Sequence, residues 1–346
     1  MKLPTPTEPT DPLSPVSDGI LPLINKVMDS VFGPASPSPS LGSWALLDFP
    51  LHANVGDSAI WLGTLELLNV RFGAPPGYVT RHKEFPADLD RILPEGPVLL
   101  HGGGNFGDLW QGFWQNRVAV LKRFHHRRIV QMPQSIHFSD LGGEALRQTR
   151  QAIAQHPDFT LLVRDNFSFE FAREQFDCPV YLCPDMAFGL RHLASPEAPQ
   201  VPVLALMRED PERRDNGTAA ATLQAQAYVT DWASAGKPSV VDRIAPSLIR
   251  ALPQLRPKLI AQLETAFLRQ ARWHLQRGVR ILGQGNVVVT DRLHGHILCS
   301  LMSKRHVVLD NSYNKITRYI AAWPDDGLTI CAATTSDAIA QLRNIS

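Results

Sequence analysis

Short apolar runs alternate with segments of helical periodicity along the chain, beginning at Trp44 and continuing almost to the C-terminus. Runs that are rich in β-branched residues and too short for a helix predict buried strands. These strands are expected at Ala45–Phe49, Val98–His101, Ile129–Met132, Thr160–Val163, Val180–Leu182, Val203–Met207, Val287–Val289 and His306–Leu309. Longer segments with apolar residues three or four positions apart predict helices. The helices are expected at Ser58–Asn69, Trp110–Phe124, Leu141–Gln155, Phe167–Gln175, Ala219–Ser234, Leu255–Gln276 and from Gly295 onward.

This alternation predicts βα units joined into mainly parallel sheets, with helices on both faces. The pattern breaks at Ala194–Val201, a Pro-rich segment that fits a hinge. Residues 1–40 form a Pro-rich N-terminal extension, in which Ile20–Phe32 carries the spacing of one amphipathic helix. We therefore expect an α/β fold with two Rossmann-like domains, residues 41–193 and 200–346, whose parallel sheets face each other across a cleft.

The charge balance of the chain argues against a nucleic-acid partner. The 34 Lys and Arg residues nearly balance the 33 Asp and Glu residues, whereas a protein that binds DNA regardless of sequence needs a basic surface. The four cysteines are scattered, with the spacing of neither a disulfide framework nor a zinc site. No apolar run approaches the roughly 18 residues of a membrane span, and no signal peptide is recognisable. We expect a cytoplasmic protein, with room for peripheral contact with the inner membrane or an assembly complex.

Polar loops in the first half follow predicted strands, where a parallel sheet presents its ligand-binding edge. In the loop after Ala45–Phe49, Gly56 allows the backbone to approach a ligand closely. Asn54 and Asp57 in the same loop can bind hydroxyl groups. The same two side chains suit capping of the next helix, and the sequence leaves both interpretations open.

A glycine-rich loop, His101–Asp108, follows the next predicted strand. Its glycines predict a flat turn with backbone N–H groups directed toward the crevice, so Gly103, Gly104 and Asn105 are candidate ligand contacts. The loop has neither the G-x-G-x-x-G spacing nor a Gly-Lys-Ser/Thr sequence, so a dinucleotide site and a P-loop are both poorly supported. A third loop contributes Gln134, whose amide suits either sugar binding or helix capping.

The densest set of candidate charged residues lies in the second half, directly after Val287–Val289. Arg292 can pair with both oxygens of a carboxylate or phosphate, and a helix beginning at Gly295 would favour the same anion. His294 adds a side chain that can exchange a proton near neutral pH. Arg208 follows the first strand of this half and should open onto the same crevice. Two arginines from different strand ends would suit the binding of one small anion.

Six short motifs occur in the order found in the polysaccharide pyruvyl transferase family, which the chain resembles from about Leu46 to Tyr319. The motifs are Asn54-x-Gly56-Asp57-x-Ala59-Ile60, Gly102-Gly103-Gly104-Asn105, Pro133-Gln134-Ser135, Val163-Arg164-Asp165, Pro184-Asp185 and Thr290-Asp291-Arg292-Leu293-His294-Gly295. Asp310 and Lys315 also fit the end of the family pattern, without an assigned role. The resemblance implies a fold like that of the two-domain GT-B glycosyltransferases.

The resemblance also implies a reaction, the transfer of pyruvate from phosphoenolpyruvate to two hydroxyls of one sugar, which forms a ketal and releases phosphate. It places the donor on the second domain, held by Arg292, Arg208 and His294, and no metal or further cofactor is expected. The sugar would belong to an exopolysaccharide or its lipid-linked precursor and would lie against the first domain. His294 is the candidate acid. Asp57 and Asp108 are the candidate bases, and the sequence does not choose between them.

Two other classes of function fit the same pattern. A GT-B glycosyltransferase in exopolysaccharide synthesis would bind a nucleotide sugar in the same cleft, and UDP- or GDP-sugars would protect it in place of phosphoenolpyruvate. A non-catalytic subunit of a polysaccharide-assembly complex would bind neither kind of donor. The grouping of Arg292 and His294 on one loop argues against this second alternative.

Overall fold

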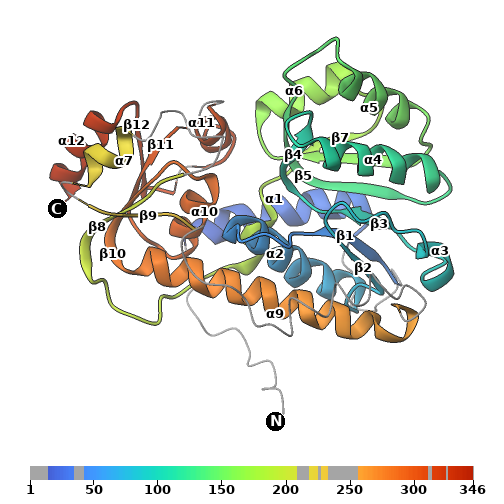
Figure 1. Ribbon diagram of the computed structural model, residues 1–346, viewed down its shortest axis with the longest axis horizontal. Coiled ribbons are helices and arrows are strands. Elements are labelled where there is room, and N and C mark those ends of the chain that lie inside the picture. The colour runs from blue at the N-terminus through green and yellow to red at the C-terminus, as the bar shows by residue number, and fades with distance from the viewer. Residues whose placement is uncertain are drawn as a thin grey trace.

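The strands form two separate sheets in which all of the pairings are parallel (Figure 1). The structure is a computed structural model that describes residues 15–34, 43–208, 218–224, 227–232, 256–310, 314–324 and 326–345. The α/β class with parallel sheets that the sequence predicts is therefore confirmed. None of the described helices combines the length and the apolar character needed to cross a membrane.

The first sheet has seven strands in the order β2-β1-β3-β5-β6-β7, with β4 paired to the end of β5. Its strands are β1 (Ala45–Phe49), β2 (Tyr78–Arg81), β3 (Val98–Leu100), β4 (Gly103–Gly107), β5 (Ile129–His137), β6 (Phe159–Val163) and β7 (Val180–Leu182). Its helices are α2 (Val55–Phe72), α3 (Leu89–Ile92), α4 (Gln111–Arg123), α5 (Glu144–Ala154), α6 (Asn166–Gln175) and the 3₁₀ helix η1 (Met186–Leu190). Leu46 in β1 lies opposite Val79 in β2 and Leu99 in β3. Both β1 and β6 are buried throughout, because helices on both faces hide both sides of each strand.

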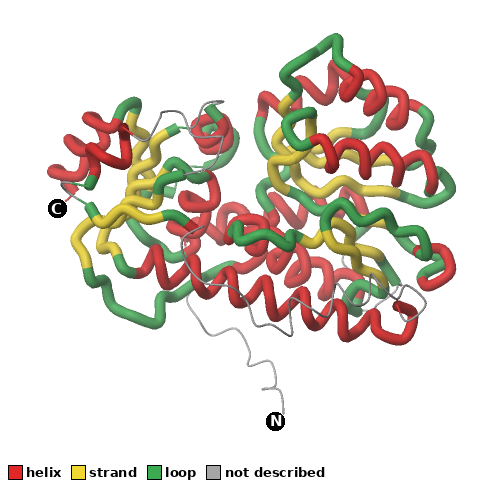
Figure 2. Tube along the Cα trace, in the orientation of Figure 1, coloured by secondary structure: helices red, strands yellow, loops and turns green. Residues whose placement is uncertain are grey.

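The second sheet has five strands in the order β12-β11-β10-β8-β9 (Figure 2). Its strands are β8 (Val201–Leu206), β9 (Tyr228–Thr230), β10 (Gly285–Thr290), β11 (His306–Leu309) and β12 (Thr329–Ala332). Its helices are α7 (Thr218–Leu223), α9 (Arg256–Gly283), α10 (Leu293–Leu301), α11 (Lys315–Ile320) and α12 (Thr335–Ile345). Val288 at the centre of β10 pairs with Leu204 in β8 and His306 in β11. The Pro-rich segment predicted as a hinge runs between η1 and β8 and so joins the two sheets.

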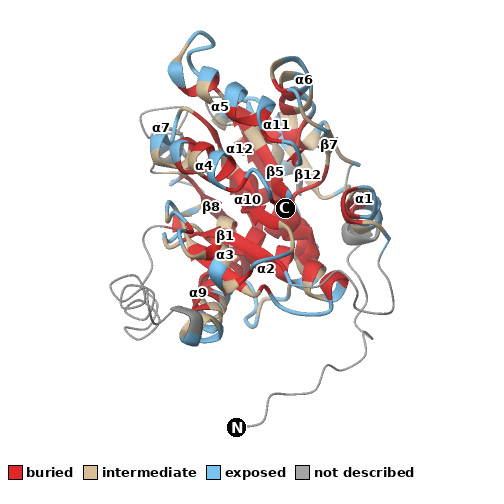
Figure 3. Cartoon of the chain, turned by 90° about the vertical axis from the view of Figure 1, so that its right-hand side faces the viewer, coloured by how far each residue is buried: buried red, intermediate tan, exposed pale blue. Residues whose placement is uncertain are grey.

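Two helices connect the halves through a shared hydrophobic core. The long helix α9 runs beneath both sheets and packs on α2 (Figure 1). Phe267 of α9 stacks on Phe49 of β1 with ring centroids 4.1 Å apart, and it meets Trp61 of α2 edge-on. The N-terminal helix α1 (Pro15–Phe32) buries Ile24 and Met28 in the same core. Figure 3 shows the buried residues concentrated in the strands and in α2 and α10.

Each predicted strand is present in the structure, but one predicted helix is wrong. The segment Ala219–Ser234 contains α7, which ends at Leu223, and then Tyr228–Thr230 forms strand β9. The helix expected from Gly295 begins earlier, at Leu293. The end of the wrongly predicted helix and the Pro-rich stretches on either side of α1 lie outside the described residues.

Candidate active site

A cleft of about 630 Å³ lies where the carboxyl ends of strands from both sheets meet. The first sheet contributes the loops after β1, β2 and β3, and the second sheet contributes the loops after β8, β9 and β10. Its charged and titratable lining includes His52, Asp57, His101, Arg208, Arg292 and His294. Because open parallel sheets bind ligands at this edge, the cleft is the candidate active site.

Arg292 immediately precedes α10 and is buried beside Asp231, the residue that follows β9. Nε and Nη2 of Arg292 donate hydrogen bonds to the two carboxylate oxygens of Asp231 at 2.6 and 2.7 Å. The sequence assigns the paired N–H donors of Arg292 to a ligand anion, but in the structure they bind a carboxylate of the protein. This ion pair fixes the plane of the guanidinium in the wall of the cleft. The sequence does not identify Asp231 as a site residue, because strand β9, which ends directly before it, lies within the helix predicted over Ala219–Ser234.

Arg208 follows β8 and lines the same cleft as Arg292. The backbone N–H of Arg208 donates to Asp291 Oδ1 at 2.8 Å, which ties the ends of β8 and β10 together. Burial raises the pKa of Asp291 to about 6, against the lowering effects of that N–H group and of the two arginines. Two guanidinium groups and the imidazole of His294 therefore line this side of the cleft.

His294 lies in the first turn of α10, with Nε2 3.4 Å from a carboxylate oxygen of Asp185. Asp185 is buried and forms a second ion pair with Arg164 at the end of the first sheet. Burial alone would raise the pKa of Asp185, but His294 and Arg164 outweigh it and hold the pKa well below its usual range. The ionised carboxylate of Asp185 thus faces the imidazole of His294.

Two glycines of the predicted site allow close packing. A Cβ atom on Gly56, in the first turn of α2, would lie 2.2 Å from His294 Nδ1. A Cβ atom on Gly295 would lie 2.4 Å from Thr290 Oγ1 at the end of β10. Gly56 lets α2 meet α10, and Gly295 lets α10 meet its own strand, so the structure gives both a packing role where the sequence suggested a ligand contact.

Asp57 projects from the first turn of α2 into the cleft, opposite the arginines. One of its carboxylate oxygens accepts a hydrogen bond from Asn54 Nδ2 at 3.0 Å and lies 3.3 Å from His52 Nε2. Asn54 also caps α2 by accepting the Gly56 N–H group, so both roles considered for this residue coexist. Burial raises the pKa of Asp57, but the surrounding histidines, His52 first among them, lower it below its usual value. Asp57 is therefore an ionised carboxylate that can accept a proton.

His101 is a buried residue of the cleft that the sequence did not single out. It follows β3 and packs against Trp61, and neither ring nitrogen hydrogen-bonds to any residue that the structure describes. Burial lowers its pKa to about 4, although Asp57 and Asp185 act in the opposite direction. His101 is thus neutral at pH 7, with a donor and an acceptor for a bound hydroxyl group.

We expect the free energy of unfolding to fall as the pH is lowered from 7 to 5, with a contribution of roughly 2 kcal/mol from His101. The pKa of His101 is lower in the folded state than in the unfolded state. The neutral ring therefore contributes its full stabilisation of the fold above pH 6.5, the pKa in the unfolded state. It is lost as the pH falls toward the folded value of about 4, because the unfolded chain takes up a proton that the native protein does not. The free energy of unfolding, measured in urea at pH 7 and at pH 5, should differ less between the two pH values for His101→Gln than for wild type. An equal difference would contradict the assignment, and exposed His125→Gln serves as the control.

The glycine-rich loop lies at the cleft but forms a strand, β4, where a flat turn was expected. Gly103 has φ of +125°, a conformation that favours glycine. A Cβ atom on Gly104 would lie 2.3 Å from Lys315 Nζ, so this glycine admits the lysine of α11 to the cleft. Gly104, Asn105 and Lys315 all line the cleft, and Lys315 is a site residue to which the sequence gave no role.

The two remaining candidates serve the loops around the cleft. Gln134 is fully buried, where its amide donates to the His101 carbonyl at 2.9 Å and to Asn105 Oδ1 at 3.0 Å. Asp108 accepts hydrogen bonds from the backbone N–H groups of Ser139 and Asp140 and from the Ser139 hydroxyl. Neither Gln134 nor Asp108 is among the described residues that line the cleft. Of the two candidate bases, only Asp57 reaches the site.

Comparisons with known proteins agree on one family. The sequence model for polysaccharide pyruvyl transferase matches residues 54–313. The chain is 30% identical to "Putative pyruvyl transferase EpsO" of Bacillus subtilis over 80% of this chain and 84% of that protein. It is 29% identical to "Pyruvyl transferase 1" of Schizosaccharomyces pombe over 86% of this chain and 75% of that protein.

A solved structure shares the fold. The crystal structure of a functionally uncharacterised protein from Klebsiella pneumoniae superposes with a TM-score of 0.55 over 90% of this chain and 97% of that chain. The two sequences are 17% identical, so the likeness concerns the fold alone. The extent of the family match, together with the two similar pyruvyl transferases, decides the class of the protein: the chain belongs to the polysaccharide pyruvyl transferase family and is an enzyme.

Proposed function

We propose that the enzyme transfers pyruvate from phosphoenolpyruvate to two hydroxyls of one sugar, in a polysaccharide or its lipid-linked precursor, and releases phosphate. The observation that carries this proposal is the meeting of Arg208, Arg292 and His294 in one cleft, opposite the ionised carboxylate of Asp57. In this proposal the two halves act as a GT-B-like pair, with the donor on the second sheet and the sugar on the first.

Phosphoenolpyruvate carries a phosphate and a carboxylate, and the positive charges of Arg208 and Arg292 favour the binding of these anionic groups in the cleft. Arg292 is held in place by Asp231, so its orientation is set before the donor binds. Such fixed donors stabilise developing charge without having to reorganise during the reaction. The N–H groups at the start of α10 add a favourable field for the phosphate.

The proton transfers follow from the placement of His294 and Asp57. His294, as imidazolium, protonates the methylene carbon of phosphoenolpyruvate and leaves an oxocarbenium-like centre on the neighbouring carbon. One sugar hydroxyl adds there while Asp57 accepts its proton, phosphate departs, and the second hydroxyl closes the ketal. Of the two hydroxyl protons, one replaces the proton taken up by the methylene group and the other leaves with phosphate.

We expect Arg292→Lys to weaken phosphoenolpyruvate binding by about tenfold to a hundredfold, which is the range for a lost charge-assisted hydrogen bond. Lysine keeps the charge but cannot form the two parallel hydrogen bonds to Asp231, so the cation loses its fixed orientation. Isothermal titration calorimetry with phosphoenolpyruvate, UDP-glucose and GDP-mannose measures the effect and tests the donor. Binding of a nucleotide sugar in preference to phosphoenolpyruvate, or unchanged affinity in the variant, would count against the proposal.

A further inference from the structure

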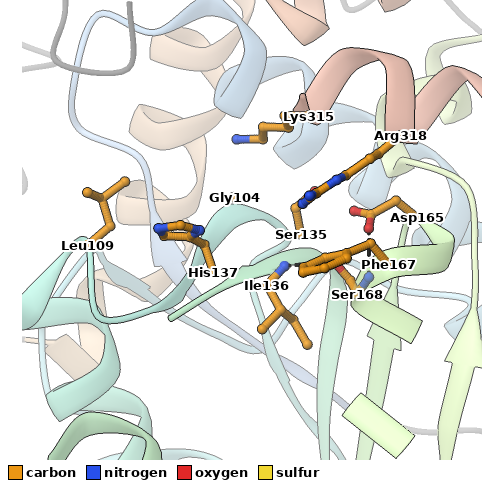
Figure 4. Close-up of a pocket in the computed structure, with 10 residues that line it drawn as sticks. All are labelled: Gly104, Leu109, Ser135, Ile136, His137, Asp165, Phe167, Ser168, Lys315 and Arg318. Carbon is orange, nitrogen blue, oxygen red and sulfur yellow. Dashed lines mark hydrogen bonds between the residues drawn. The ribbon is translucent and has the colours of Figure 1, made fainter. Parts of the chain in front are cut away.

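A second, smaller pocket opens beside the cleft and shares Gly104 and Lys315 with it (Figure 4). One wall is the end of β5 with the start of α6, and the other is α11 of the second half. We call it the side pocket, and the residues that matter here are Leu109, His137, Phe167, Lys315 and Arg318. Because both spaces are lined by Gly104 and Lys315, a ligand bound in the cleft can extend a group into the side pocket.

The side pocket exposes apolar surface. Phe167 is 46% exposed and Leu109 is 41% exposed, and Trp110, which lines the adjoining part of the cleft, is 40% exposed. Large apolar side chains are normally hidden, and exposed ones that gather in one place mark binding surfaces. Exposed apolar side chains of this kind suit the apolar parts of a bound ligand.

The side pocket is also positively charged. The Arg318 guanidinium lies 3.8 Å from the centroid of the Phe167 ring, and Figure 4 shows the two side chains facing each other. Within the described part of the chain, no carboxylate lies within ion-pair distance of Arg318. The one carboxylate in the lining, Asp165, is buried and accepts the backbone N–H of Ser168 as the cap of α6.

The stacked position of Arg318 decides what it can bind. A guanidinium packed against an aromatic ring keeps its N–H donors at its edge, where they can pair with both oxygens of a carboxylate or phosphate. Lys315 on the same helix adds a second positive charge between the side pocket and the cleft. Apolar contact and anion pairing are thus available next to each other.

We propose that the side pocket binds the acidic group next to the sugar that receives pyruvate, with the paired oxygens of that group on Arg318 and its apolar part against the exposed side chains of Phe167 and Leu109. This inference rests on the proposed function, since it assigns the cleft to the acceptor sugar. The anion is either a uronate carboxylate within the glycan or a phosphate of a lipid carrier, and both present paired oxygens to the same arginine.

The test measures the affinity of three probes by fluorescence titration. They are a galacturonate-containing trisaccharide, the same trisaccharide with galactose in place of the galacturonate, and galactose linked to prenyl diphosphate. The wild type should bind at least one acidic probe about tenfold tighter than the neutral one, and Arg318→Ala should remove that preference. The acidic probe that gains affinity identifies the anion as carboxylate or phosphate.

Arg173→Ala is the matched control, because Arg173 also lies over a phenylalanine, Phe169, on α6 but not in the side pocket. It should keep the wild-type preference, and the melting temperatures of both variants should match that of the wild type. Equal affinity of wild type for all three probes, or an intact preference in Arg318→Ala, would overturn the inference. Phosphoenolpyruvate binding to wild type is measured in parallel. Its absence would count against the proposed function, whereas the preference for an acidic probe tests the assignment of the side pocket.

Discussion

Replacing His294 with alanine is expected to lower the turnover number for phosphate release from phosphoenolpyruvate by about 10²–10⁴-fold, the usual effect of removing a general acid. The expectation follows from the position of the ring, with Nε2 3.4 Å from the ionised Asp185 and the side chain lining the cleft beside both arginines. No other histidine among the described residues is placed next to Asp185 by an ion-pair contact.

The measurement is steady-state phosphate release at saturating phosphoenolpyruvate with an acceptor sugar present. His125→Ala provides the control, because His125 is exposed and is not among the residues that line the cleft. The affinity for phosphoenolpyruvate, measured separately, should change much less than the turnover number, since the arginines that bind the donor stay in place. A turnover number within a few-fold of wild type would remove His294 from the role of acid.

The second large effect is expected for Asp57→Asn, which should also lower the turnover number by about 10²–10⁴-fold because the amide cannot accept a proton. Asparagine keeps the shape of the side chain, so the capped first turn of α2 and the fold should persist. Donor affinity should persist as well, because Asp57 lies on the opposite wall from Arg208 and Arg292.

Asp108→Asn is the matched control for Asp57. Both aspartates follow strands of the first sheet, but Asp108 binds the Ser139 turn, whereas Asp57 reaches the cleft. Asp108→Asn should therefore retain turnover. The dependence of turnover on pH adds a second readout. Wild type should lose activity at low pH as Asp57 is protonated, and Asp57→Asn should not show this loss. Similar losses in both variants would contradict the choice of Asp57 as base.

The parts of the fold that depend on local sequence were predictable. Val287–Val289 predicts β10 because β-branched residues in a short run favour a buried strand. The segment after Thr218 was misjudged because alanines there favour a helix, and the tripeptide Tyr228–Thr230 is too short to compete as a local signal. β4, whose residues are mostly glycine, has no strand pattern at all and depends on its pairing with β5.

The site was predictable as a set of residue types but not as a set of partners. Arg208, Arg292, His294 and Asp57 reach one cleft, because strand ends of parallel sheets share an edge. The pairing of Arg292 with Asp231 joins residues 61 positions apart, and the spacing of apolar residues along the chain does not predict such a contact. The packing roles of Gly56 and Gly295 were also hidden, since the close contacts of α2 with α10 and of α10 with β10 exist only in the folded chain.

The most direct test of the whole account is an analysis of the product. Wild-type enzyme is incubated with phosphoenolpyruvate carrying ¹³C at its methylene carbon, together with an acceptor galactoside, and the sugar is examined by NMR and mass spectrometry. The account predicts that the label appears as the methyl group of a ketal bridging two oxygens of one sugar, with one phosphate released for each ketal formed, and that His294→Ala yields almost none. Unlabelled sugar with intact phosphoenolpyruvate, while UDP-galactose is consumed to extend the acceptor, would contradict it.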